Sequence, residues 1–122
     1  MFKYNLKGQV APKHLNEAND CSVRAVANAS GKSYEEIHQI MKDLGRVNGL
    51  PFNTRMAAAG AMKAGGKLFI CESVNDYRLL QGSYVVFNQQ HCFCLKDGEI
   101  IDTIKPNLSD KLLGIFYFRG DI

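Results

Sequence analysis

Small and apolar residues follow one another with little interruption over residues 21–29, near the start of the chain. Only Arg24 and Asn28 break this run, and Ser30 and Gly31 end it, because glycine commonly closes a helix. A helix with so few polar positions is normally buried, and its small side chains let neighbouring backbone come close. We therefore predict a central, buried helix over these residues.

Two further helices are predicted to follow. Ser33 and Glu36 have the spacing of a capping box, which opens a helix. The apolar face of that helix consists of Tyr34, Ile37, Ile40, Met41 and Leu44. Asn53 or Thr54 is expected to cap a third helix, rich in alanine and methionine, that runs to about Ala64.

The second half of the chain changes to extended patterns, in which β-branched and aromatic residues form short runs. We predict strands over residues 67–71, 84–88, 91–96, 99–104 and 112–118. The third and fourth of these flank Asp97 and Gly98, a dipeptide that strongly favours a two-residue hairpin turn. Residues 74–80 are expected to form a short helix or turn, and residues 1–18 a loop or short strand.

This order, with helices first and strands second, is typical of an α+β fold. We expect N-terminal helices, including the central buried helix, to pack on a C-terminal antiparallel sheet. A chain of 122 residues is long enough to build one core. We therefore expect residues 1–122 to form a single domain.

Composition and charge narrow the classes of protein that need to be considered. The hydrophobic fraction of 46% and the charged fraction of 22% argue against a disordered or fibrous chain. The net charge of +3 is small and the basic residues are scattered, so we do not expect nucleic-acid binding. The sequence contains no segment of signal-peptide or membrane-span type, so we expect a cytoplasmic protein with reduced cysteines and no membrane partner.

The most prominent chemical group is the thiol of Cys21, which follows a polar segment at the start of the first predicted helix. Asp20 or Asn19 is expected to cap that helix by accepting hydrogen bonds from first-turn amides. The partial positive charge of a helix N-terminus favours a thiolate, which makes a cysteine there more nucleophilic. A buried, unreactive thiol is the competing interpretation, because free cysteines are often core residues.

The predicted hairpin brings two further groups together. If Lys96 pairs with Glu99, the two-residue turn places His91 and Asp102 on the same face of the hairpin, as diagonal neighbours. A carboxylate beside an imidazole orients the ring and makes it more basic, as nucleophilic catalysis requires. Cys21, His91 and Asp102 are therefore candidate catalytic residues.

The remaining cysteines leave two interpretations open. Cys92 and Cys94 are expected on the opposite face of the hairpin from His91, and together with Cys71 they would be small core residues. The alternative is a zinc site formed by these three cysteines and His91. Adjacent strand residues point in opposite directions and the spacing is not that of common zinc motifs, so we expect no metal or other cofactor.

Taken together, these motifs resemble the papain-like cysteine peptidase superfamily. The likeness lies in the sequence Asn19-Asp20-Cys21-Ser22-Val23-Arg24-Ala25, followed by the His91 strand and the hairpin that ends at Asp102. It is nearest to the peptidase C39-like group and to small phage-borne proteins with an Asn-Asp-Cys-x-x-Arg-Ala helix. The resemblance implies a papain-like fold, with Cys21 as nucleophile, His91 as general base and Asp102 orienting the imidazole.

The sequence departs from this family pattern at one position. Such enzymes usually carry a glutamine ahead of the cysteine that donates to the oxyanion, and Leu15 stands there in this chain. Asn16 and Asn19 are the candidate side-chain donors, with the backbone amide of Cys21 as a second donor. A missing donor typically lowers the rate about a hundredfold or more.

Two functional hypotheses follow from the resemblance. The first is a thiol hydrolase, in the first place a cysteine protease, that cleaves an amide or isopeptide bond in a peptide or protein through a thioester. The sequence does not distinguish this activity from that of a deamidase, amidase or transglutaminase. The second is a catalytically weak or inactive papain-like binding module, such as a phage protein that acts on a host factor in the host cytoplasm.

Overall fold

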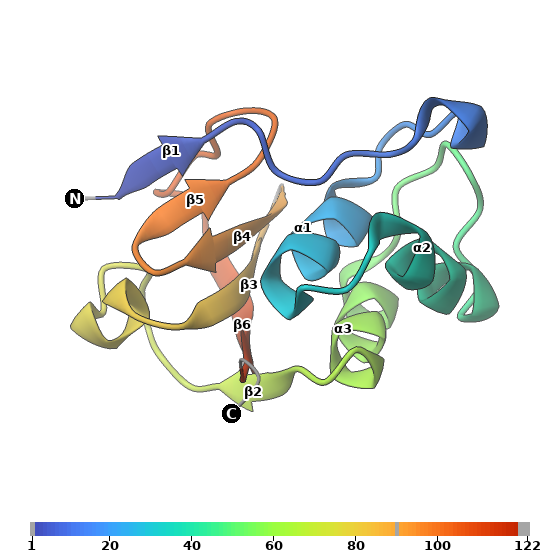
Figure 1. The fold of residues 1–122 in the computed structure, drawn as a ribbon. Helices are drawn as coiled ribbons and strands as arrows, with labels where there is room; N and C mark the ends of the chain where they lie inside the picture. Colours follow the sequence, from blue (N-terminus) through green and yellow to red (C-terminus); the bar gives the residue numbers. More distant parts are fainter. Residues whose placement is uncertain (1, 90, 120–122) are drawn as a thin grey trace.

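Three helices pack against a six-stranded mixed sheet in the computed structural model, which describes residues 2–89 and 91–119 (Figure 1). The helices are α1 (Cys21–Ser30), α2 (Tyr34–Asp43) and α3 (Thr54–Lys63). They lie together on one side of the sheet, and α1 is the one that packs most closely on it. The α+β class expected from the order of the elements is confirmed.

The predicted helix ends agree with the local hydrogen bonds. Gly31 closes α1 in the left-handed conformation, with φ of 76°. Ser33 Oγ accepts a hydrogen bond of 3.1 Å from the Glu36 backbone amide at the start of α2. At the start of α3, Asn53 Oδ1 accepts a hydrogen bond from the backbone amide of Met56. These contacts satisfy first-turn groups that have no acceptor within the helix.

The strands are β1 (Lys3–Asn5), β2 (Lys67–Phe69), β3 (Ser83–Asn88), β4 (Cys92–Lys96), β5 (Glu99–Ile101) and β6 (Leu112–Phe118). Their order across the sheet is β1-β5-β4-β3-β6-β2. All neighbouring strands are antiparallel except β1, which pairs in parallel with β5. The sheet is therefore mixed, and the prediction of an antiparallel sheet was wrong at this edge. The parallel partner comes from the N-terminal segment, whose short apolar content gave little indication of a long-range pairing.

The hairpin between β4 and β5 has the predicted register. Asp97 and Gly98 both have positive φ, at 50° and 78°, as a two-residue turn of this type requires. Lys96 lies opposite Glu99, and the ladder continues only as far as Cys94 and Ile101. The predicted strand 99–104 is thus shorter than expected, and Asp102 follows its end.

Two apolar clusters occupy the two faces of the sheet. The face toward the helices contributes Val85, Phe87, Cys92, Cys94, Phe116 and Phe118, which pack with the buried side of α1. The opposite face contributes Tyr84, Val86, Phe93, Leu95, Ile100 and Ile115. Cys71 packs at the edge of this second cluster. Cys71 therefore lies on the other side of the sheet from Cys92 and Cys94, and no group of metal-binding side chains occurs within residues 2–89 and 91–119.

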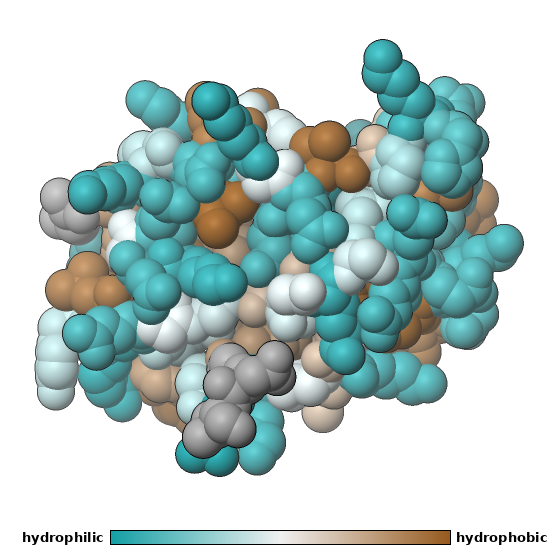
Figure 2. All heavy atoms as spheres, viewed as in Figure 1, coloured by the Kyte–Doolittle hydropathy of each residue, from teal (hydrophilic) through white to brown (hydrophobic). Residues whose placement is uncertain are grey.

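The surface seen in Figure 2 is mainly hydrophilic, with small and separate hydrophobic patches. In the described part of the chain, none of the helices is long and apolar enough to span a membrane.

Candidate active site

Cys21 is the first residue of α1, and its side chain is partly buried against the helix-side cluster. The residue lines a cavity of about 160 Å³ whose walls include Ser22, Pro51, Phe52, Phe87, His91 and Cys92. The backbone amide of Cys92 helps to lower the pKa of the Cys21 thiol. The start of α1 therefore presents the thiol to a pocket with mixed walls. Its described lining combines apolar side chains with polar ones such as Asn88 and Gln89, and His91 is its ionisable side chain besides the cysteines.

His91 and Asp102 are in direct contact. His91 Nε2 lies 2.5 Å from Asp102 Oδ2, and the imidazole lines the same cavity as Cys21, whose proximity contributes to raising the pKa of His91. Asn88 Oδ1 accepts a hydrogen bond of 2.8 Å from the His91 backbone amide, which fixes the turn that carries the histidine. The three predicted residues thus lie in series, from thiol to imidazole to carboxylate, in the order that the sequence predicted.

The route by which they meet differs from the one predicted. Strict strand alternation would turn His91 away from Cys92, yet both residues line the cavity beside Cys21. The reason is that His91 lies just before β4 and Asp102 just after β5, so neither belongs to the paired ladder. Strand alternation governs side-chain direction only inside the ladder.

The electrostatics of the cluster favour charge separation. Burial raises the pKa of the Cys21 thiol, but the hydrogen bond and the charge of His91 outweigh it and lower this pKa overall. The hydrogen bond from His91 to Asp102, followed by the one to Cys21, raises the pKa of His91 to about 9. The lowered pKa of Cys21 and the raised pKa of His91 both favour a thiolate–imidazolium pair, and the thiolate is the nucleophilic form of cysteine.

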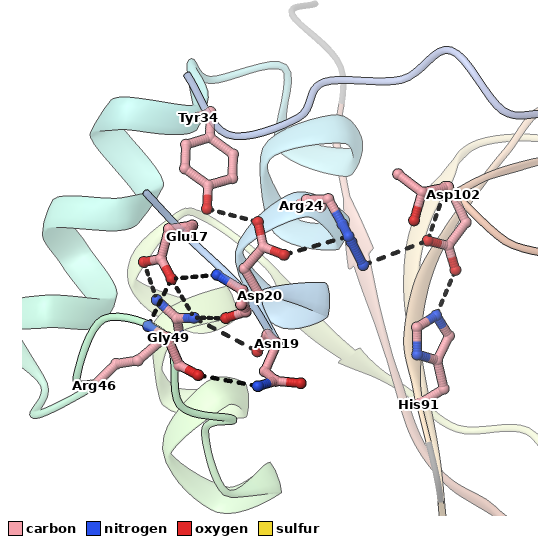
Figure 3. Close-up of polar contacts among 11 residues, drawn as sticks. Glu17, Asn19, Asp20, Arg24, Tyr34, Arg46, Gly49, His91 and Asp102 are labelled. Atoms are coloured by element: carbon pink, nitrogen blue, oxygen red, sulfur yellow. Dashed lines mark hydrogen bonds and ion pairs between the residues drawn. The ribbon is translucent and has the colours of Figure 1, made fainter. Parts of the chain in front are cut away.

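Asp20 does not cap α1 as the sequence analysis predicted. Its side chain forms no capping hydrogen bond. Instead, Asp20 Oδ2 accepts a hydrogen bond of 2.7 Å from the Tyr34 hydroxyl, and Oδ1 lies 3.3 Å from Arg24 Nη1. Arg24 Nη2 lies 3.7 Å from Asp102 Oδ1, so this side chain bridges the two carboxylates (Figure 3). Sequence reasoning missed this link, although Asp20 and Arg24 have the i,i+4 spacing of helical ion pairs.

A second polar cluster holds the segment that precedes Cys21. Glu17 accepts two hydrogen bonds from Arg46, of 2.6 and 3.0 Å, and a further hydrogen bond from the backbone amide of Gly49. His38 Nε2 lies 2.8 Å from Glu17 Oε2. The fold thereby ties residues 17–19 to the loop after α2, as Figure 3 shows. None of these contacts was predicted, because the partners are far apart in the sequence.

The two candidate oxyanion donors, Asn16 and Asn19, lie outside the pocket beside Cys21. Asn16 is exposed and has a left-handed backbone, with φ of 49°. Asn19 Nδ2 donates a hydrogen bond of 2.9 Å to the Gly49 carbonyl. Among the described residues that line the cavity, neither asparagine occurs. The Cys21 amide, in the first turn of α1, remains the donor that the fold itself provides, since first-turn amides have no acceptor within their helix.

Comparisons with protein-family models, with curated protein sequences and with solved structures found no match to this chain.

Proposed function

We propose that this chain is a small papain-like thiol hydrolase that cleaves an amide or isopeptide bond in a peptide or protein substrate. The observation that carries the proposal is the series formed by the Cys21 thiol, the His91 imidazole and the Asp102 carboxylate. A buried helix that presents a thiol to a histidine just before an interior strand of the sheet supports the papain-like assignment. The elevated pKa of His91, about 9, supports an ion pair that is formed before substrate binds.

The proposed reaction starts from the Cys21 thiolate and the His91 imidazolium. The sulfur attacks the carbonyl carbon, and the carbonyl π electrons move to the oxygen as the tetrahedral intermediate forms. The C–N bond then breaks, and His91 transfers its proton to the departing amine, which leaves an acyl thioester on Cys21. Water next gives a proton to His91 and attacks the thioester, and the acid product leaves as Cys21 recovers its thiolate.

The cavity beside Cys21 supports a substrate with an apolar side chain near the scissile bond. Pro51, Phe52 and Phe87 supply apolar walls of the pocket. Cleavage of a protein, release of an amide and transfer to an amine all pass through the same thioester. Protease, deamidase, amidase and transglutaminase activities therefore remain alternatives within this proposal.

Alkylation with iodoacetamide at pH 6 tests the nucleophile, and the chain contains its own control. Cys71 is also partly exposed, but burial raises the pKa of its thiol. We expect Cys21 to be alkylated at least about tenfold faster than Cys71 or a model thiol, because only thiolates react. Mass spectrometry of proteolytic peptides would locate the modification. Equal rates at Cys21 and at the model thiol would refute the proposed nucleophile.

A second candidate function is a papain-like binding module with weak or no catalysis, such as a phage protein that acts on a host factor. The observation that favours it is the position of Asn16 and Asn19, which do not line the cavity among the described residues. The two functions differ in their response to Cys21→Ala. A binding module keeps its partner and its phenotype in this variant, whereas a hydrolase with an intact fold loses its phenotype.

A further inference from the structure

Arg24 links α1, the helix that carries Cys21, to the carboxylate of Asp102. Its two terminal nitrogens point to different carboxylates, with Nη1 3.3 Å from Asp20 and Nη2 3.7 Å from Asp102. Figure 3 shows the guanidinium lying between these two side chains. Its side chain is 14% exposed and that of Asp102 is 3% exposed, so water screens the interaction only weakly.

Asp20 is itself held in place by another element. The Tyr34 hydroxyl, from the first residue of α2, donates a hydrogen bond of 2.7 Å to Asp20 Oδ2. Burial, together with the hydrogen bond to Asp20, raises the pKa of Tyr34, so the hydroxyl keeps its proton and remains a donor. A chain of contacts therefore runs from Tyr34 through Asp20 and Arg24 to Asp102, and then to His91.

The other contacts of Asp102 are to backbone. The Thr103 amide donates a hydrogen bond of 2.7 Å to Asp102 Oδ1, but Thr103 is the next residue and moves with the same loop. The Asp102 backbone amide donates to the Asn5 carbonyl, which fixes its main chain but not its carboxylate. Because Asp102 lies beyond the end of β5, the sheet ladder does not set its side-chain direction. Arg24 is the partner that ties this carboxylate to α1.

We propose that Arg24 is a positioning residue, which holds Asp102 so that Oδ2 faces His91 Nε2 while α1 presents Cys21 to the same imidazole. This inference rests on the proposed function and explains why an arginine follows the nucleophile on α1. In this arrangement Asp20 and Tyr34 are the supports that keep the guanidinium aimed at Asp102. The ionisable and charged groups around the cluster are Tyr34, Asp20, Arg24, Asp102, His91, Cys21 and Cys92.

NMR titration of the His91 ring tests this proposal without any substrate. The native protein is expected to titrate at pH about 9 at this residue. In Arg24→Gln the midpoint is expected to fall by about one pH unit. Loss of a nearby cation by itself raises it, but a carboxylate that is no longer aimed at the ring stabilises the imidazolium much less, and this second effect is the larger one in the proposal. Arg24→Lys keeps the charge but cannot bind both carboxylates through one planar group, so its midpoint should lie between the two.

The matched control is Lys32→Gln, which removes a cation from the exposed pair with Glu36, at 3.6 Å. It should leave the His91 midpoint unchanged. A purely structural role of Arg24 would lower the melting temperature and leave the midpoint where it is. A folded Arg24→Gln protein whose His91 titrates at the native midpoint, or above it, would overturn the proposal.

Two further measurements keep the test decisive. If Arg24→Gln does not fold, Tyr34→Phe removes only the hydroxyl that holds Asp20, and the His91 midpoint should fall by a few tenths of a unit. An unchanged midpoint in folded Tyr34→Phe would then overturn the proposal. The native protein separates the two claims: if His91 titrates near 6.5 and Cys21 is unreactive at pH 6, the proposed function fails before any variant is considered.

Discussion

Two largely buried arginines, Arg24 and Arg46, bind carboxylates in different ways. Both terminal nitrogens of Arg46 donate hydrogen bonds to Glu17, of 2.6 and 3.0 Å. The side chain of Arg46 is 2% exposed and that of Glu17 is 0% exposed. Arg24 is divided between Asp20 and Asp102 at 3.3 and 3.7 Å, and its side chain is less deeply buried. Each carboxylate also contacts an imidazole, Glu17 that of His38 and Asp102 that of His91. The difference is that two nitrogens of one arginine bind Glu17, whereas a single nitrogen of Arg24 lies near Asp102.

The difference follows from what each ion pair has to do. A buried pair must recover the cost of desolvating two charges, and a two-pronged arginine–carboxylate contact with further hydrogen bonds does so best. Glu17 has this arrangement, and its partners fix the backbone that leads to Cys21. Asp102 has one nitrogen of Arg24 3.7 Å from Oδ1, and its Oδ2 faces His91, so this looser contact serves the orientation of an imidazole.

Arg46→Met should break the two-pronged pair with Glu17 and have the largest effect on stability. It leaves the Glu17 carboxylate buried without its main partner, and we expect the free energy of unfolding to fall by about 3–5 kcal/mol. Urea unfolding measures this loss. The double variant Glu17→Gln/Arg46→Met should recover part of it, and Lys32→Met, in an exposed pair, should cost less than about 0.5 kcal/mol. Equal losses in Arg46→Met and Lys32→Met would contradict the comparison.

Asp102→Asn should change the pKa of His91 and the reactivity of Cys21 more than it changes the stability of the protein. Asparagine keeps the shape and the acceptor for the Thr103 amide, but it removes the charge beside His91. The pKa of His91 should fall from about 9 toward its ordinary value near 6.5, and the reactivity of Cys21 at pH 6 should fall roughly hundredfold. Iodoacetamide kinetics and urea unfolding provide the two readouts. The exposed Asp43→Asn is a suitable control, and native reactivity in Asp102→Asn would show that the carboxylate is not needed.

The stability of the fold should depend on pH through the Glu17 carboxyl, which tests the Glu17–Arg46 pair separately from the Asp102 cluster. Burial opposes ionisation of this carboxyl, but the hydrogen bonds from Arg46 and from the Gly49 amide lower its pKa from 4.5 to about 2. A carboxyl with a lowered pKa stabilises the fold above its unfolded pKa and loses that contribution as the pH falls through its folded pKa. Between pH 4.5 and 2 we therefore expect a loss of about 2–3 kcal/mol.

Urea unfolding of the native protein and of Glu17→Gln over this pH range isolates the contribution. The variant lacks the titrating group, so its stability should fall less steeply with acid. Arg78 also lowers the pKa of the exposed Asp76 to about 2, but this pair is present in both proteins and cancels in the comparison. Parallel slopes in the two proteins would mean that folding does not lower the pKa of Glu17.

Local sequence patterns were sufficient for most of the secondary structure. Ser33, Asn53 and Gly31 act where capping rules place them, because each rule involves only neighbours in the chain. The Asp97-Gly98 turn fixed the register of the hairpin for the same reason. The grouping of Cys21, His91 and Asp102 could be anticipated from a helix start and this register, together with a family resemblance.

The failures occurred where side chains have partners that are distant in the sequence. Asp20 has the right residue type for a helix cap, but Tyr34 and Arg24 compete for its carboxylate, and they prevail. The N-terminal strand β1 joins the sheet beside β5, some 94 residues away in the case of Asn5 and Glu99. Capping preferences and strand patterns contain no information on such pairings.

By itself, the sequence determined the helices, the hairpin and the position of a thiol at a helix start, since these depend on contacts between neighbouring residues. Only the tertiary structure decided what surrounds that thiol. His91 and Asp102 meet beyond the ends of their strands, where alternation no longer directs side chains. Arg24 and Arg46 find their carboxylates across separate elements, and the burial of these charges makes the choice of partner matter energetically.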